Sequence, residues 1–304
     1  MSGLLILKPL AVTDVTLVSS NVPENDAPVY AAGTTYAAKA LVMYKHSVYE
    51  SAADNNVGNT PDLKPDKWVR VRATNRWRLF DGTNSSRTEQ ATTISYVFAP
   101  EVPITMVAAL NLAKCTSARV RLVDPSLPVE SQTYYDVTQS PGPRPIKADW
   151  WEWFFGIWSP GLSYCLFQGL PVRPGAYVMV DLVGGTGLAI GMLMYGQPRS
   201  WGMGVLQGAR VGRRSYSRRE VNDFGDFSLV RRPSAKQGSF ETLLDVNEVD
   251  AVQDYLDAID ASVCLFVGSS KRNATVIYGV YQNNEVLLKH ARYSILQIDI
   301  LGVT

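Results

Sequence analysis

The run TTISYVFAP, residues 92–100, opens the part of the sequence that decides the fold. Three similar runs follow it: MVAALNLAK (106–114), ARVRLVD (118–124) and QTYYDVT (132–138). Such runs are mostly 5 to 9 residues long and are bounded by Pro, Gly, Asn or Asp. This spacing is typical of an antiparallel β-sandwich, so we expect two facing sheets of short strands here.

The composition agrees with a folded, strand-rich chain. Of 304 residues, 46% are hydrophobic and 19% charged, which excludes wholesale disorder and allows roughly two domains. The 17 prolines and 23 glycines favour strands and turns over a helical bundle. A net charge of +1 gives no global attraction to nucleic acid or to an anionic membrane.

Residues outside this central region also form strand-like runs. LLILKPLAVTDVTLVSSNVPEND (4–26) predicts one or two strands, without the basic region and cleavage site of an export signal. The apolar window 177–195 is interrupted by Gly184-Gly185-Thr186-Gly187, which predicts two strands joined by a glycine turn instead of a membrane span. Three widely spaced cysteines in apolar surroundings predict buried, reduced thiols and synthesis in the cytosol.

The block WWEWFFGIW, residues 150–158, is the most unusual local composition. Read as a strand, it places Trp151, Trp153 and Phe155 on one face and Trp150, Glu152 and Phe154 on the other. The rings then cover the core, with one face hidden by a neighbouring subunit; a stacking platform for sugar or base rings is the alternative.

The C-terminal third has two stretches of opposite charge. Residues 199–236 contain nine basic and three acidic residues (+6), whereas 241–260 contain seven acidic and no basic residues (−7). Apolar residues at helical spacing predict one helix over about 246–259, with Asp245 and Glu248 as a capping box. Strands follow, with a turn at Asn283-Asn284, so this part is α+β.

Little of the sequence suits catalysis. Neither of the two histidines, His46 and His290, has a second ligand at metal-binding spacing. The glycine run lacks the Lys-Ser/Thr of a phosphate loop, and Cys165 with the distant His290 is the only conceivable nucleophile pair. We therefore expect no enzyme, no catalytic residue, no metal and no cofactor.

Residues 27–72 resemble the small carbohydrate-binding modules of chitinases and cellulases. The family pattern is matched in order by Tyr30, Gly33, Tyr36, Val42, Tyr49, Asn56, Gly58, Pro61 and Trp68. A first tryptophan is replaced by Tyr30, and the glycine before the central strand by Lys39. The resemblance implies sugar contact through Tyr30, Tyr49 and Asn56. It implies packing for Tyr36 and Trp68, because so small a module needs most of its rings inside. Vestigial binding stays open beside real binding.

The wider chain resembles tail proteins of tailed bacteriophages and prophages, of the distal-tail kind. The phrases that carry this are NVPEND (21–26), TNRWRLFDG (74–82), FGDFSLVRRP (224–233), Tyr278-Gly279 and the final strand Ile298–Gly302. The implied fold is mainly β: a β-sandwich (1–26 plus 73–200) with the inserted carbohydrate-binding-like β module (27–72), followed by an α+β, tail-tube-like barrel domain with one helix (201–304).

The resemblance implies a virion structural protein of the tail tip or baseplate, made in the host cytoplasm. Its partners are then copies of itself in a ring, six by analogy with the family, other tail and baseplate proteins, and cell-surface polysaccharide. Opposite charges suit head-to-tail contacts between neighbours, so Arg213, Arg214, Arg218 and Arg219 are expected to meet Asp250, Asp254 and Asp257. Ordinary surface ion pairing of the two stretches within one chain is the alternative. A carbohydrate-binding protein without a role in tail assembly is the alternative; nucleic-acid binding by the arginines is disfavoured by the adjacent acids.

Overall fold

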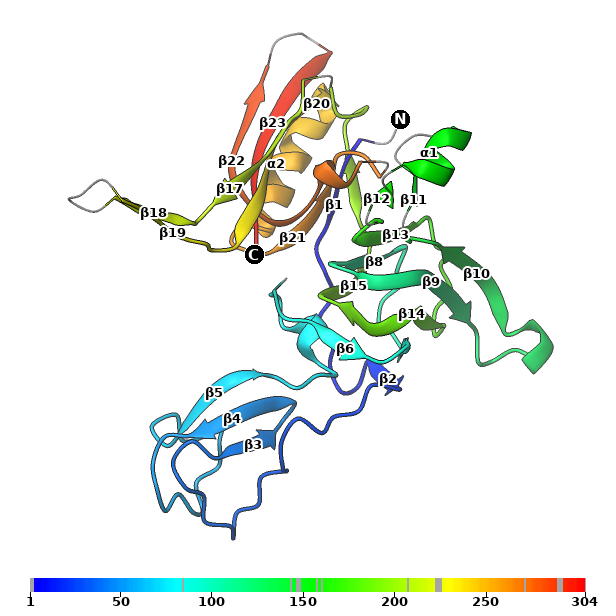
Figure 1. Ribbon diagram of the computed structural model, residues 1–304. Helices are drawn as coiled ribbons and strands as arrows, with labels where there is room; N and C mark the ends of the chain where they lie inside the picture. Colours follow the sequence, from blue (N-terminus) through cyan, green and yellow to red (C-terminus); the bar gives the residue numbers. More distant parts are fainter. Residues whose placement is uncertain are drawn as a thin grey trace.

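The chain is mainly antiparallel β-structure, as predicted, with 49% of residues in strands and 10% in helices. The computed structural model describes residues 3–303 except 84, 143, 146–148, 157, 160, 207, 222–225, 271 and 289–291. Figure 1 shows a body built of several sheets, from which a small three-stranded unit and a long β-hairpin project in different directions.

The first sheet of the body has six strands. Its order is β10–β9–β14–β7–β2, and β6 pairs with the end of β14. The bounds are β2 (Leu17–Ser20), β6 (Thr88–Gln90), β7 (Thr93–Phe98), β9 (Ala113–Val123), β10 (Thr133–Gln139) and β14 (Tyr177–Ile190). Along β7, Ile94, Tyr96 and Phe98 are buried in alternation with less buried residues, because one face of the sheet is covered.

A three-stranded sheet, β13–β8–β15, covers that face. Its strands are β8 (Met106–Leu110), β13 (Tyr164–Gln168) and β15 (Met192–Gly196). All of β8 is buried because this sheet is covered on both sides. Val107 and Ala109 join the core shared with the six-stranded sheet, whereas Met106 and Ala108 join a second core on the opposite side.

A seven-stranded sheet lies across that second core, in the order β16–β1–β21–β22–β23–β20–β17. The bounds are β1 (Leu4–Leu7), β16 (Arg199–Trp201), β17 (Arg210–Ser215), β20 (Ser234–Asp245), β21 (Cys264–Val267), β22 (Val276–Leu287) and β23 (Tyr293–Gly302). Residues 1–26 were assigned by sequence to the sandwich, but β1 pairs here, with Leu5 opposite Ser200 and Val267. The reason is burial: Leu4 and Ile6 enter one core of this sheet and Leu7 the other.

The helix predicted over 246–259 is confirmed. A 3₁₀ turn, η3 (Val246–Glu248), leads into α2 (Val249–Ala258). The predicted capping residue Asp245 accepts a hydrogen bond from the N–H of Asn247 at 2.9 Å. Val252, Leu256 and Ile259 pack on the face of the seven-stranded sheet that is turned away from the second core.

Between β2 and β6 the chain leaves the body. It forms an antiparallel sheet of β3 (Leu41–Tyr44), β4 (Ser47–Ser51) and β5 (Trp68–Ala73), and returns through the 3₁₀ turn η1 (Arg78–Phe80). We call residues 27–72 the module. Figure 1 shows it as a separate unit beside β2 and β6, far from α2.

The second projection is the continuation of β17 and β20. It contains the hairpin of β18 (Arg218–Val221) and β19 (Phe227–Val230), and we call residues 210–236 the arm. Figure 1 shows the arm extending away from the edge of the seven-stranded sheet.

The aromatic block is a helix, not the predicted strand. Trp150–Phe155 form α1, one and a half turns long, between the short strands β11 (Arg144–Pro145) and β12 (Trp158–Ser159). Two 3₁₀ turns complete the list of elements: η2 (Val129–Ser131) and η4 (Asn273–Thr275). In a run of aromatic residues broken only by Glu152, strand and helix alternation cannot be distinguished from the sequence.

Two predicted turns are also wrong, because each is an irregularity inside a continuous strand. The pairing of β14 with β9 shifts register at Gly184, where a Cβ would lie 2.1 Å from the carbonyl oxygen of Lys114. Glycine is needed there for close approach, and not for a hairpin turn. Likewise Asn283-Asn284 lies within β22, next to a register shift opposite β23.

Candidate functional site

The rings of the module form one cluster. Tyr30 stacks on Tyr36 at 5.9 Å between centroids and an interplanar angle of 24°. Edge contacts join Tyr30 to Trp68 at 5.9 Å and to Tyr44 at 5.7 Å. Trp68 is 2% exposed, and its indole N–H donates to the carbonyl of Asn59. The cluster therefore has a buried base, Trp68, and half-buried tyrosines above it.

The structure does not separate the tyrosines predicted to pack in the core from those predicted to bind sugar. Tyr36 packs against Trp68, and its hydroxyl accepts a hydrogen bond from the N–H of Ala31 at 2.8 Å. The Tyr30 hydroxyl is buried without a hydrogen-bond partner, so Tyr30 contributes to the core as well as to the surface. Tyr49 is half-buried on β4, opposite Val42 and Arg70 and apart from this ring cluster.

Asn56 does not lie where a sugar contact requires it. It was predicted to contact sugar, but it is only 3% exposed. Its amide donates to Ser51 Oγ at 3.0 Å and to the carbonyl of Lys67 at 3.2 Å, and its Oδ1 accepts from Asn59 at 2.8 Å. The module has no disulfide, so this amide holds its loops together and is not available to a ligand.

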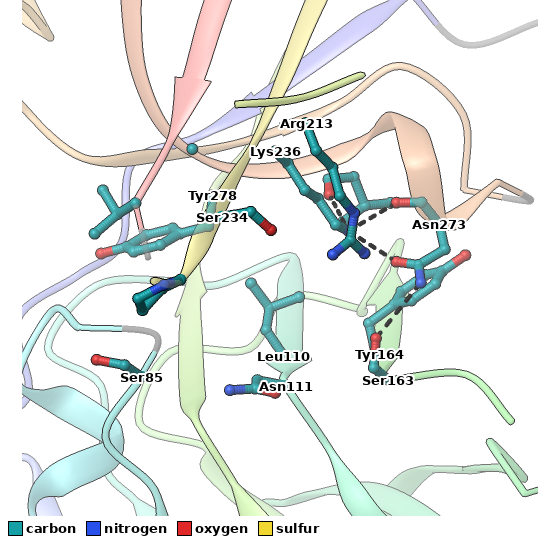
Figure 2. A pocket seen from close by; sticks show the side chains of 14 residues that line it. Ser85, Leu110, Asn111, Ser163, Tyr164, Arg213, Ser234, Lys236, Asn273 and Tyr278 are labelled. Atoms are coloured by element: carbon teal, nitrogen blue, oxygen red, sulfur yellow. Dashed lines mark hydrogen bonds between the residues drawn. The ribbon is translucent and has the colours of Figure 1, made fainter. Parts of the chain in front are cut away.

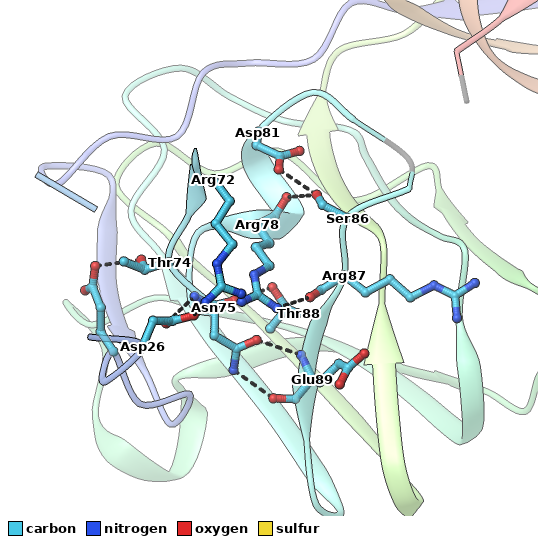
Figure 3. A network of polar contacts seen from close by, with 11 residues as sticks. Asp26, Arg72, Thr74, Asn75, Arg78, Asp81, Ser86, Arg87, Thr88 and Glu89 are labelled. Atoms are coloured by element: carbon cyan, nitrogen blue, oxygen red, sulfur yellow. Dashed lines mark hydrogen bonds and ion pairs between the residues drawn. The ribbon is translucent and has the colours of Figure 1, made fainter. Parts of the chain in front are cut away.

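A network of charged groups fixes the module to the body (Figure 3). The Asp26 carboxylate accepts from the N–H of Asn75 at 2.7 Å and from the Arg78 guanidinium at 2.8 Å, and Arg72 lies 3.6 Å from it. Its neighbour Glu24 accepts from Thr74 at 2.7 Å. Both acids belong to the segment NVPEND (21–26), for which the sequence predicts no specific contact.

His46 lies in the same region, on the turn between β3 and β4. Its ring nitrogens lie 2.8 Å from an Asp14 oxygen and 2.9 Å from a Glu24 oxygen, and the ring packs on Trp77 at 4.3 Å. These contacts give His46 a structural role at the base of the module.

The arm carries the predicted basic residues on an exposed hairpin. Arg213 and Arg214 are consecutive residues of β17, so their side chains point to opposite faces of the strand. Among the described residues, Arg218 forms an ion pair with Glu220 of the same hairpin, at 2.6 Å. The side chain of Arg219 lies outside the part described. Phe227, Leu229 and Val230 of β19 are 63%, 55% and 46% exposed, so the arm also presents apolar surface that sequence reasoning missed.

The predicted acidic partners line the exposed side of α2. Asp250, Asp254 and Asp257 follow helical spacing opposite the buried Val252 and Leu256. Within the described residues, no ion pair joins these aspartates to the arm or to any other cation. The acidic surface of α2 is thus not neutralised by the described residues of its own chain, whereas on the arm Arg218 is paired with Glu220.

Helix α1 is the largest exposed aromatic surface in the part of the chain described. Its rings are all more than half exposed: Trp150 69%, Trp151 58%, Trp153 54%, Phe154 72% and Phe155 68%. A strand would have hidden one face, but this helix shows rings on every side.

The described residues give little support to catalysis. They hold no group of three or more His, Cys, Asp or Glu side chains close enough to bind a metal ion. Cys165 is 2% exposed in the core between two sheets, and His290 lies outside the described residues. All three cysteines are buried thiols outside any disulfide, as predicted, and burial raises the pKa of the Cys264 thiol to about 11. Such a thiol is a poor nucleophile.

Comparison with protein-family models, curated proteins and solved structures found no match for this chain. Among the described residues, no helix is both long and apolar enough to cross a membrane. The functional argument therefore depends on the surfaces described above.

Proposed function

We propose that the chain is a structural subunit of a bacteriophage tail tip or baseplate that assembles into a ring through the arm and α2. The phage assignment depends on the sequence resemblance. The observation that carries the assembly role is the pair of exposed surfaces of opposite charge, Arg213 and Arg214 on the arm and three aspartates on α2, which form no ion pair with the described residues of their own chain.

Two different complementary surfaces produce head-to-tail contacts, and such contacts close into a ring when the rotation between subunits allows it. The arm projects from the edge of the seven-stranded sheet, so it is free to lie over α2 of a neighbour. Its exposed Phe227 and Leu229 add apolar contact area, which supplies affinity that isolated surface ion pairs lack.

The same proposal assigns a role to each part of the fold. The six- and three-stranded sheets with their common core serve as a β-sandwich, and the seven-stranded sheet with α2 serves as the barrel-like, ring-forming unit. The module is then an insertion that faces outward and contacts surface polysaccharide of the host.

The test is charge reversal. Changing Arg213, Arg214, Arg218 and Arg219 to Glu is expected to abolish the ring in light-scattering and sedimentation measurements, and changing Asp250, Asp254 and Asp257 to Lys in the same protein is expected to restore it. Four reversals at module cations (Lys39, Lys64, Lys67 and Arg70) provide the matched control. A ring that survives reversal on the arm, or is equally lost in the control, contradicts the proposal.

A carbohydrate-binding protein without a role in assembly is the second candidate. The stacked Tyr30 and Tyr36 with the adjacent Tyr44 favour it, since tyrosine faces pack on pyranose rings. A chain that stays monomeric at high concentration and is retained on a polysaccharide column supports this candidate over the first.

A further inference from the structure

A pocket of about 310 Å³ lies where the three-stranded sheet meets the seven-stranded sheet (Figure 2). Leu110 and Tyr164 line it from the first sheet, and Arg213, Lys236, Val276 and Tyr278 from the second. Its volume is at the lower end of the range of ligand pockets, about 300 to 1,000 Å³. It is far from the ring cluster of the module, so it is a separate site.

The charge in this pocket has one sign. Arg213 and Lys236 are the charged groups among the described residues that line it, and these include no acid. The half-buried Lys236 ammonium donates to the carbonyl and Oδ1 of Asn273, each at 3.0 Å, and to the carbonyl of Val276 at 3.1 Å. These acceptors are neutral, so they hold the ammonium in place but leave its charge uncompensated. Burial, and then the charge of Arg213, lower the pKa of Lys236.

Arg213 supplies the free donors. Its guanidinium has no ion pair or hydrogen bond to any described residue, and Figure 2 shows it next to Lys236 and Asn273. A guanidinium binds carboxylate or phosphate through two parallel N–H donors. An oxyanion on Arg213 also gains from the fixed positive charge of Lys236, because the site is partly shielded from water.

The other walls suit a small organic body. Tyr164 and Tyr278 provide rings, Leu110 and Val276 provide apolar surface, and Ser85 and Ser234 provide hydroxyl groups. Rings beside hydroxyl groups are the surroundings that contact a pyranose. We propose that this pocket binds a small acidic sugar through its carboxylate or phosphate group.

The test is calorimetric titration of the full chain with D-glucuronate, D-glucose 6-phosphate, inorganic phosphate and neutral D-glucose. Three proteins are compared: wild type, Arg213→Gln, and Arg214→Gln as the matched control. Arg214→Gln removes the same charge from the same strand. Strand alternation directs the Arg214 side chain to the opposite face, where its guanidinium lies over the Tyr216 ring. We expect at least one acidic sugar to bind wild type and Arg214→Gln equally, and Arg213→Gln to weaken that binding by about 10- to 100-fold.

The titrations with glucuronate and with glucose 6-phosphate show which oxyanion is preferred. Equal affinity for glucose, loss of binding in Arg214→Gln, or no binding of either acidic sugar overturns the proposal. Inorganic phosphate that binds as tightly as the sugar phosphate overturns the sugar part. The measurement is made on monomer separated by size, so a failed ring proposal leaves its outcome unaffected.

Discussion

The carboxylate of Asp26 accepts a hydrogen bond from the backbone N–H of Asn75, 49 residues further along the chain, at 2.7 Å. This bond closes the neck of the module, because the chain leaves the body beside the first residue and returns beside the second. The two ends of the module are therefore close together at its base.

Deletion of residues 28–71 with a short Gly/Ser link is expected to leave the body folded. The deletion keeps Asp26, Arg72, Asn75 and Arg78, and adjacent ends at the surface tolerate such changes. A cooperative unfolding transition and a soluble product are the expected observations. An aggregated or non-cooperative product means that the module is part of the body.

Asp26→Ala is expected to lower the free energy of unfolding by about 3 kcal/mol, since it leaves the Arg78 guanidinium without its partner in a mostly buried site. The Asp26 and Arg78 side chains are 5% and 17% exposed. Asp62→Ala is the control: the Lys45 side chain of its ion pair is 66% exposed, so a much smaller loss is expected. Chemical denaturation measures both, and equal effects contradict the burial argument.

Tyr30→Phe is expected to leave the module as stable as wild type or slightly more stable, because it removes a buried hydroxyl that has no partner. Tyr30→Ala removes the ring from the cluster around Trp68 and is expected to cost about 3 kcal/mol or more. Binding to a polysaccharide column compares these variants with Tyr49→Ala. Retention that survives Tyr30→Ala and Tyr49→Ala alike excludes both tyrosines as the sugar contact.

Alkaline pH is expected to destabilise the contact of α2 with the seven-stranded sheet. Burial raises the pKa of Tyr255 to about 12 from the ordinary 10.0. Between these values the unfolded chain holds fewer protons than the folded chain, so the free energy of unfolding falls as pH rises. Urea denaturation at about pH 9 and about pH 11 measures this loss. Tyr255→Phe is expected to lose less than wild type, and an identical loss means that other groups cause it.

Helix α1 is expected to bind hydrophobic dyes in the monomer. Replacing Trp151 and Phe155, whose rings lie 4.6 Å apart, with Ser is expected to reduce dye fluorescence and to change the free energy of unfolding by less than about 0.5 kcal/mol. If a subunit neighbour covers α1, acrylamide quenching of the tryptophans falls on assembly. Quenching that is weak already in the monomer contradicts the exposure of these rings.

The sequence predicts elements whose signals are local. The helix at 249–258 follows from its own spacing, with Val252 and Leu256 on one side and the aspartates on the other. The strand character of 93–98 follows in the same way from alternation. In both cases, residues that are close in the chain determine which face is buried.

The failures involve information from distant residues. In the sequence Gly184 looks like a turn residue, because its close contact with Lys114 is seen only in the structure. Asn56 likewise looks like a ligand-binding residue, because its hydrogen bonds to Ser51 and Lys67 are seen only in the structure. The pocket at Lys236 was not predicted, because its walls come from strands more than one hundred residues apart. Only the fold brings them together.

The position of β1 between β16 and β21 affects how this protein is synthesised and how it can be divided. The strand is synthesised well before its partners, residues 199–201 and 264–267, so it stays unpaired until they follow. A fragment of residues 201–304 lacks it and exposes the hydrogen-bonding edge of β21. A synthetic peptide of residues 3–8 is then expected to bind that fragment by strand complementation, so that one segment of the chain acts as a ligand for another.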